Sequence, residues 1–361
     1  MPASNYDGPI DWDAFATYCR ANPKATICGD YCMARPDDAL CAAVPSYYKY
    51  RVSLAANAVF LALFSLSFLL FLSTYIFTRR GLAFSIALLL GVACEIIGYV
   101  GRILSWKNQW QENGFLIQII CLTIGPAFMA AGIYFCLRRI VYAFGPKNSR
   151  IRPEWYTRIF IPCDVISLVL QAAGGGIASV ASHNGDPVDT GDNIMIAGLS
   201  FQVLTLLIFM ACSIDFGFNA WRRFKSMGTA AFDQSAAALK LRSSWLFHAF
   251  LAALTLATVC IFWRSVYRVA ELSKGWDGPL MYRQGLFIGF EGVMVVVACL
   301  ALNAFHPSVC MRDVMEGAGG IGSKGKKGKM NADGTEGFDM LEPPKSEPVS
   351  DADTSRIGAA H

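Results

Sequence analysis

Long apolar stretches separated by short polar connections dominate the hydropathy pattern of the chain. Seven of these stretches reach the roughly 20 residues that a helix needs to cross the hydrocarbon core of a bilayer. They are residues 53–77, 82–104, 115–137, 156–179, 194–216, 244–264 and 285–304. The pattern predicts an all-α integral membrane protein with seven transmembrane helices.

The seven stretches divide the chain into three parts. Residues 1–50 form an N-terminal tail, residues 51–307 hold the transmembrane domain, and residues 308–361 form a C-terminal tail. The C-terminal tail begins with glycines and lysines and continues with acidic residues, Pro and Ser. Because it has few large apolar residues to bury, we expect it to be disordered. Overall, 54% of the residues are hydrophobic and 16% are charged, which excludes an ordinary soluble enzyme.

Basic residues concentrate in alternate connections. The connections after the first, third and fifth stretches hold Arg79, Arg80, Arg138, Arg139, Lys147, Arg150, Arg152, Arg158, Arg222, Arg223, Lys225, Lys240 and Arg242. The opposite connections hold only Arg102, Lys107, Arg264, Arg268, Lys274 and Arg283. Because cytoplasmic loops carry the excess of Lys and Arg, we expect the N-terminus outside and the C-terminus in the cytoplasm.

Four cysteines, Cys19, Cys28, Cys32 and Cys41, lie in the N-terminal tail with the spacing C-x8-C-x3-C-x8-C. The expected topology places them in an oxidising compartment, where cysteines form disulfides. We therefore predict two disulfides. Four cysteines allow three connectivities, and the sequence does not choose between them. A zinc site would favour short CxxC pairs on the reducing side, so we predict no metal.

The fourth stretch carries polar residues on one face. At 3.6 residues per turn, this face gathers Asp164, Ser167, Gln171, Gly174, Gly175 and Ala178. A carboxylate at membrane depth is costly unless it is paired or hydrated, so the face should point into the protein. Small residues there let a second helix approach closely. Asp164 is then either a hydrogen-bonded structural anchor or, together with Gln171, part of a substrate route.

Six charged residues should lie in the outer half of the membrane or at its outer surface, namely Glu95, Arg102, Arg264, Arg268, Glu271 and Glu291. We interpret Arg102, Arg264, Arg268 and Glu271 as a structural charge network. Glu95, Glu291, Gln118 and Gln202 join Asp164 and Gln171 as candidate substrate-binding residues. The alternative is a belt of salt bridges that ties the second, sixth and seventh helices together.

The third stretch contains Pro126 directly after Gly125. Proline has no backbone N–H to donate inside a helix, so it should kink this helix or free a carbonyl group.

The sequence lacks the residues and motifs that several functional classes require. The chain has only four histidines, too few and too scattered for an intramembrane zinc hydrolase. No phosphate-binding GxxxxGK[ST] loop is present, so ATP-driven transport has no support. The third stretch has no DRY motif and the seventh no NPxxY motif, although a receptor would share the seven-helix plan. We therefore predict no enzyme activity, no catalytic residue, no cofactor and no nucleic-acid partner.

From about Tyr48 to Pro307 the chain resembles a family of fungal lipid-translocating exporters, also described as resistance-to-aminocholesterol-like proteins. The motifs that carry the resemblance are Tyr48-Lys49-Tyr50 with Ala56-Asn57, Glu95-Ile96-Ile97-Gly98-Tyr99 with Gly101-Arg102, Gln118-Ile119-Ile120 with Pro126-Ala127-Phe128, Asp164 with Ser167, Gln171 and Gly174-Gly175-Gly176, Gly198-Leu199 with Gln202, Arg264-Ser265-Val266-Tyr267-Arg268 with Glu271, and His306-Pro307.

The resemblance implies a fungal membrane protein linked to the export of sphingoid long-chain bases or to tolerance of toxic amphiphiles. Its partners would be membrane lipids and an amphiphilic substrate, and we expect it in the plasma membrane. The ammonium head and long chain of a sphingoid base suit a buried carboxylate beside an apolar groove. A seven-helix receptor or lipid sensor acting through cytoplasmic partners is the alternative function.

Overall fold

The fold is all-helical in the residues that the computed structural model describes, which are 12–22, 26–44, 46–48, 50–145, 148–184, 186–232, 236–273 and 278–311. Seven of its helical segments are long and apolar enough to cross a membrane. They are α3 (Leu54–Thr78), α4 (Leu82–Lys107), α5 (Glu112–Phe144), α6 (Pro153–Asn184), α7 (Asp189–Met227), α9 (Trp245–Leu272) and the segment that begins with α10 (Gln284–Phe287). The prediction of seven membrane-spanning helices is confirmed, and the protein is an integral, multi-pass membrane protein.

The helices begin and end where the local sequence favours a boundary. Ser53 caps α3 by accepting a hydrogen bond from the backbone N–H of Ala56 at 3.5 Å. A tight turn then leads into α4, with Arg79 at φ 53° and Gly81 at φ 68°. Gly145, at φ 97°, ends α5. Glycine adopts such positive φ angles without the steric cost of a Cβ atom.

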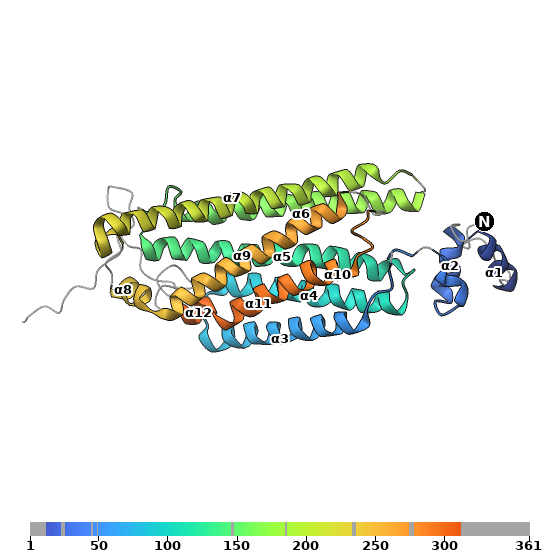
Figure 1. Cartoon of the computed structure of the whole chain (residues 1–361), viewed down its shortest axis with the longest axis horizontal. Coiled ribbons are helices and arrows are strands. Elements are labelled where there is room, and N and C mark those ends of the chain that lie inside the picture. The colour runs from blue at the N-terminus through green and yellow to red at the C-terminus, as the bar shows by residue number, and fades with distance from the viewer. Residues whose placement is uncertain are drawn as a thin grey trace, which may run out of the picture. The chain divides into compact units, whose positions relative to one another are not determined.

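Helices α6 and α7 run side by side, as Figure 1 shows, and α4 packs closely on α5. Glycines allow both approaches. A Cβ atom on Gly91 of α4 would lie 2.9 Å from the carbonyl oxygen of Gly125 on α5. One on Gly101 would lie 2.9 Å from the carbonyl oxygen of Gly114. Such small-residue contacts are typical of helix packing in membranes.

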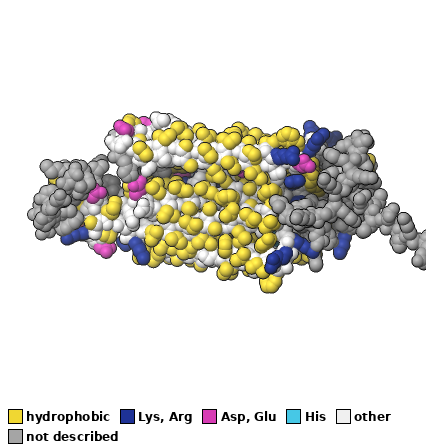
Figure 2. Space-filling model, turned by 180° about the vertical axis from the view of Figure 1, so that it is seen from behind, with side chains coloured by type: hydrophobic (Ala, Val, Ile, Leu, Met, Phe, Trp, Pro, Cys, Tyr) yellow, Lys and Arg dark blue, Asp and Glu magenta, His cyan; other side chains and the backbone are white. Residues whose placement is uncertain are grey.

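Apolar side chains cover the middle of the bundle, while Lys and Arg lie toward its two ends (Figure 2). Leu69 on α3, Val169 on α6 and Ile214 on α7 are 61%, 62% and 69% exposed. This belt of exposed aliphatic side chains is the surface that a bilayer would cover.

The seventh span is not one regular helix. It begins with the single α-helical turn of α10, which is followed by η5 (Ile288–Val293), a π-helix. The segments α11 (Met294–Ala304) and α12 (Pro307–Cys310) come next. Short π-helical insertions are rare and occur frequently at functional sites. This one carries Glu291, whose side chain is completely buried.

The N-terminal tail contains α1 (Trp12–Ala21), α2 (Thr26–Ala34) and η2 (Ala39–Ala42). Two disulfides, Cys19–Cys28 and Cys32–Cys41, hold it together. The prediction of two disulfides is confirmed, and the structure selects the pairing of neighbours along the chain. The side chain of Asn108, after α4, donates to the backbone carbonyl of Met33 at 2.9 Å.

We call the end of the bundle that carries this tail and the α4–α5 and α6–α7 connections the disulfide end. The opposite end, with the α3–α4 and α5–α6 connections and α8 (Ala236–Ser243), is the basic end. The chain divides into a unit of residues 1–318 and a second unit of residues 319–361. The second unit, and with it most of the C-terminal tail expected to be disordered, lies outside the described residues.

Candidate functional site: a lateral groove and two buried polar clusters

Asp164 lies on the buried face of α6 and is only 4% exposed. Its Oδ2 accepts a hydrogen bond from the hydroxyl of Tyr134 on α5 at 2.9 Å. Its Oδ1 is buried and has no hydrogen-bond partner among the described residues. The carboxylate therefore has the structural anchor considered from the sequence, and it also keeps one acceptor that no described residue uses.

Gln171 lies two turns along the same face and donates from Nε2 to the Oε1 of Gln202 on α7 at 3.1 Å. Both side chains are buried. Gln171 and Gln202 thus meet across the contact between α6 and α7, whereas Asp164 contacts α5. The polar face of the fourth stretch points into the protein, as predicted.

The closest approach of α6 and α7 occurs at Gly174. A Cβ atom there would lie 2.5 Å from the backbone nitrogen of Met195 and 2.7 Å from the carbonyl oxygen of Gly191. Gly175 would meet only the sulfur of Met195, at 4.0 Å, and Gly176 has open space. The expectation that Gly175 takes part in the close helix contact is therefore wrong. Successive residues of an α-helix are rotated by about 100° about its axis, so Gly175 points away from the side on which Gly174 meets α7.

A groove of about 870 Å³ lies between the halves of α5, α7 and α9 nearer the basic end. This volume falls within the roughly 300–1,000 Å³ of pockets that bind small ligands. Its lining is mainly apolar, with polar or charged side chains from Ser213, Thr229, Arg242, Ser243, His248, Thr255 and Thr258. Two further lining residues, Ile214 and Trp221, are 69% and 57% exposed, so the groove opens sideways onto the apolar belt.

The inner end of the groove reaches the surroundings of Asp164. Ile133 and Phe209 line it there. The ring of Phe209 lies 4.5 Å from that of Tyr134, between centroids, and Tyr134 holds Asp164. Phe209 and Tyr134 therefore connect the groove to the carboxylate through two packed aromatic side chains.

A second buried cluster joins α9 to the seventh span. Nε of Arg264 donates to Oε1 of Glu291 at 3.1 Å, and its Nη2 donates to the same oxygen at 2.5 Å. Arg268 pairs with Glu271 at 2.5 Å, and its Nε lies 3.9 Å from Oε2 of Glu291. These four residues are each at most 5% exposed. The structure therefore brings together four of the six charged residues expected to form a network.

Arg264 also donates to the backbone carbonyl of Leu122 on α5. In an uninterrupted helix this carbonyl would accept from residue 126, four positions later. Residue 126 is Pro126, which has no N–H to give. Of the two outcomes expected from this proline, a free carbonyl is present, and Arg264 uses it.

Arg102 does not join an acid, contrary to the network interpretation. Its Nε donates to Oδ1 of Asn57 on α3 at 2.9 Å, and its Nη2 donates to the hydroxyl of Tyr50 at 3.1 Å. Its guanidinium carbon also lies 3.9 Å from the centroid of the Phe287 ring. Such a cation over an aromatic face is stabilised without a carboxylate.

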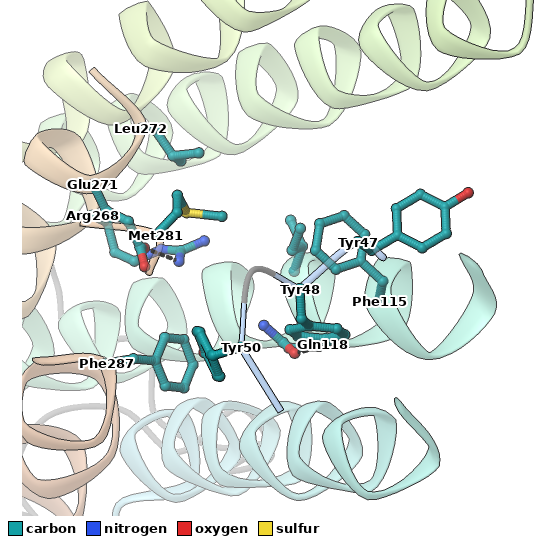
Figure 3. A pocket seen from close by; sticks show the side chains of 11 residues that line it. Tyr47, Tyr48, Tyr50, Phe115, Gln118, Arg268, Glu271, Leu272, Met281 and Phe287 are labelled. Carbon is teal, nitrogen blue, oxygen red and sulfur yellow. Dashed lines mark hydrogen bonds and ion pairs between the residues drawn. The ribbon is translucent and has the colours of Figure 1, made fainter. Parts of the chain in front are cut away.

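Gln118 lies at the disulfide end, away from Asp164. Its Oε1 accepts from the hydroxyl of Tyr48 at 2.5 Å. Burial raises the pKa of Tyr48 to about 12, so this hydroxyl stays protonated and donates at neutral pH. Figure 3 shows Tyr48 and Gln118 on one side of a small pocket and the Arg268–Glu271 pair on the other. The pocket has a volume of about 20 Å³, enough for one water molecule.

Glu95 is completely buried, and within the part of the chain that the structure describes neither of its carboxylate oxygens has a hydrogen-bond partner. It is the fourteenth of 26 residues in α4, so it lies close to the middle of the helix. Electrostatic interactions connect it with Glu291, Arg264 and Arg268. Glu95 thus borders the second cluster without forming a pair in it.

A model of the RTA1-like protein family matches residues 88–313, well over half of the chain. The chain belongs to this family. Its relatives include the sphingoid long-chain base transporter RSB1 of Saccharomyces cerevisiae, which is 34% identical over 249 residues. That alignment covers 63% of this chain and 65%, slightly under two thirds, of the relative. The resemblance drawn from the motifs is confirmed.

Another relative is protoporphyrin uptake protein 1 of Saccharomyces cerevisiae, 29% identical over 222 residues, with 61% of this chain and 68% of the relative covered. Protein RTM1 of Saccharomyces cerevisiae is also 29% identical, over 216 residues, with 60% of this chain and 64% of the relative covered. No solved structure matches the chain. Membership of the family therefore rests on sequence.

Sequence reasoning missed several residues of these sites. Tyr134 and Phe209 lie among many aromatic residues of apolar stretches, and no sequence signal distinguishes them. One sequence signal pointed to the carbonyl of Leu122. Because this residue precedes Pro126 by four positions, its carbonyl lacks the usual N–H partner in the helix. Asn57 and Tyr50 belong to the family motifs, but only the fold brings them to Arg102.

Proposed function

We propose that this protein transports amphiphilic lipids with a single long chain, and sphingoid long-chain bases in particular. The groove between α5, α7 and α9 would take the alkyl chain, and Asp164 would receive the ammonium group. The observation that carries this proposal is the groove of about 870 Å³, which opens onto the apolar belt and ends against Phe209. The ring of Phe209 packs on Tyr134, which binds Asp164, and Oδ1 of Asp164 has no hydrogen-bond partner among the described residues. A chain in such a groove stays in an apolar environment while the head finds an opposite charge.

The head group has a path beyond Phe209. Gln171 and Gln202 continue along the α6–α7 contact, where their amides offer hydrogen bonds to the hydroxyl groups of a sphingoid base. Gln118 and Glu291 lie near the disulfide end, and we assign them to a later stage of the same route. The yeast relative RSB1 is a sphingoid long-chain base transporter by name, which agrees with this substrate class. We further propose that the activity underlies tolerance of toxic amphiphiles.

We place the disulfide end outside the cell and the basic end in the cytoplasm of a plasma-membrane protein. The support is the excess of Lys and Arg in the connections at the basic end and the disulfides of the tail. Thiol labelling of intact cells tests this topology. Cys19, Cys28, Cys32 and Cys41 should react in intact cells only after reduction. Reaction that requires permeabilised cells would reverse the orientation.

The transport proposal is tested with purified protein in liposomes and a fluorescent long-chain base. Wild-type protein should move this probe between leaflets, and Asp164→Asn should slow it at least about tenfold, the equivalent of about 1.4 kcal/mol. A fluorescent ceramide, which has a similar chain but no charge, should be affected less by the substitution. Tyr134→Phe is the matched control, because it removes the anchor of Asp164 and retains the carboxylate.

Two outcomes would contradict the proposal. An Asp164→Asn variant that folds and moves the charged probe at the wild-type rate removes Asp164 from the substrate route. Wild-type protein that binds the probe without moving it, but recruits a cytoplasmic partner in response, is a receptor or lipid sensor.

A further inference from the structure

Glu95 has an environment in which a negative charge is not balanced. The side chain is 0% exposed at the middle of α4, and both oxygens lack hydrogen-bond partners. Gly125 of α5 faces it so closely that a Cβ atom there would lie 2.8 Å from Oε1. Glycine therefore leaves just enough room for the carboxyl group.

The helices around Glu95 contribute few ionisable groups. α9 contributes Arg264 and Arg268, and η5 contributes Glu291. Glu95 also interacts electrostatically with three thiols, those of Cys94 on α4, Cys121 on α5 and Cys299 on α11. Tyr99, one turn along α4, interacts with Glu95 and packs against the Phe60 and Phe64 rings of α3.

The arginines already have acidic partners. Arg264 binds Glu291, and Arg268 binds Glu271. Arg102, two turns along α4 from Glu95, binds Asn57 and Tyr50. An ionised Glu95 would therefore have no hydrogen bond or ion pair of its own among the described residues. Because an uncompensated charge inside a membrane protein is very costly, one carboxyl group of this cluster holds a proton. Glu95 is that group, since it alone of the three accepts no hydrogen bond from an arginine.

We propose that Glu95 is a proton-binding residue and that its release and uptake of a proton is coupled to transport of the amphiphile. This inference rests on the proposed transport function and extends it to the source of energy. In the step, the O–H bond of the Glu95 carboxyl group breaks, the electron pair stays on the carboxylate, and a water molecule accepts the proton.

The structure supplies a counter-ion for this step and space for a water molecule in the same cluster. The small pocket at the disulfide end has room for one water and is lined by Arg268 and Glu271. Oε2 of Glu291, which has no hydrogen-bond partner among the described residues, lies 3.9 Å from Nε of Arg268. Nη1 of Arg264 is also buried without a partner. It can pair with Glu95 once the proton has left, which gives the cluster two alternative arrangements.

Infrared spectroscopy of the full-length protein in lipid nanodiscs tests the proton site directly. A protonated, unbonded carboxyl group gives a C=O stretching band that shifts on exchange into D₂O. At neutral pH the wild-type band should be present, and it should be lost in Glu95→Gln, an uncharged variant of the same shape. Asp164→Asn should retain the band. Gly125→Ala is a second variant in case Glu95→Gln folds poorly, and it should shift the band by crowding Oε1. Wild-type protein without the band, or Glu95→Gln protein that keeps it, overturns the assignment.

Proteoliposomes containing a pH-sensitive dye test the coupling. A proton gradient should accelerate wild-type movement of the fluorescent long-chain base at least fivefold, and addition of the base should change the internal pH. Glu95→Gln should still bind the base, but its transport should not respond to the gradient. Equal transport by the wild type with and without the gradient overturns the coupling and leaves the transport function standing. Absence of any transport by the wild type overturns the proposed function, while the infrared result decides whether Glu95 binds a proton.

Discussion

Arg264 of α9 donates a hydrogen bond to the backbone carbonyl of Leu122 in the middle of α5. This contact exists because Pro126 cannot occupy the same carbonyl. An imperfection in one helix thereby becomes the binding site for a buried arginine from another. The π-helix of the seventh span supplies the second partner of Arg264, which is Glu291.

Removal of one charge from the Arg264–Glu291 pair should destabilise the protein strongly. We expect Arg264→Gln to lower the free energy of unfolding by roughly 3–5 kcal/mol, because Glu291 stays buried without its partner. Glu291→Gln should lower it less, because an ionised Glu95 can pair with Arg264. The double variant should recover part of this loss. Thermal unfolding in detergent, followed by size-exclusion chromatography, measures all three. Strictly additive losses would show that the two side chains do not stabilise each other.

The contact between α6 and α7 depends on Gly174 and not on the glycines that follow it. Gly174→Ala should cost about 1–3 kcal/mol, because its Cβ atom would lie 2.5 Å from the backbone nitrogen of Met195. Gly176→Ala, where a Cβ atom meets nothing within 4 Å, is the matched control. Yield and thermal stability of the two purified variants provide the comparison. Equal stability of both variants would contradict this packing.

A bulky side chain in the groove should block transport and spare folding. Gly217 lines the groove and has no atom within 4 Å of a potential Cβ, so Gly217→Trp can fill the space without displacing backbone. We expect it to reduce movement of the fluorescent long-chain base at least about tenfold, the equivalent of roughly 1.4 kcal/mol. Gly176→Trp, which introduces the same side chain outside the groove, should retain transport. Unimpaired transport by a folded Gly217→Trp protein would exclude the groove as the route.

The stability of the disulfide-bonded tail should fall at low pH and again at high pH. The hydroxyl of Tyr31 donates to Asp38 at 2.5 Å, which holds the pKa of Asp38 below its ordinary value and raises that of Tyr31. The Asp38 contribution to stability is complete above its unfolded pKa of about 3.9 and is lost as pH falls through the lower folded pKa. The Tyr31 contribution is complete below about pH 10 and is lost as pH rises through the higher folded pKa.

Protease sensitivity of the tail, measured against pH, checks this prediction. Cleavage should accelerate below about pH 4 in the wild type. Asp38→Asn, which no longer titrates there, should remove that acceleration, whereas Asp37→Asn at the exposed neighbouring position should keep it. An acid response that persists in Asp38→Asn would assign it to another group.

Reduction should loosen the same tail in two separable steps. Each disulfide closes a loop between cysteines nine positions apart, Cys19–Cys28 and Cys32–Cys41, and stabilises the tail by roughly 2–3 kcal/mol. Peptide mapping without reductant should find these two pairs. Paired substitution of Cys19 and Cys28 by Ser should leave the other bond intact. A link between Cys28 and Cys32 in wild-type protein would overturn this connectivity.

Local sequence patterns were sufficient for several features. The polar face of α6 is buried at Asp164, Gln171 and Gly174, because a period of 3.6 residues places them on one side of the helix. The same period does not say which of the adjacent glycines, Gly174 or Gly175, meets the neighbouring backbone. That depends on the rotation of α6 about its axis, which is set by packing against α7.

By itself, the sequence determined the seven membrane helices, their approximate bounds, the two disulfides and the family. These depend on runs of apolar residues, on cysteine content and on motifs, which are properties of neighbours along the chain. Only the tertiary structure decided that Tyr134 holds Asp164, that Arg102 pairs with Asn57 instead of an acid, and that Glu95 has no partner. Each of these depends on distances between helices far apart in sequence. Helix rotation and depth fix such distances, and hydropathy constrains both only loosely.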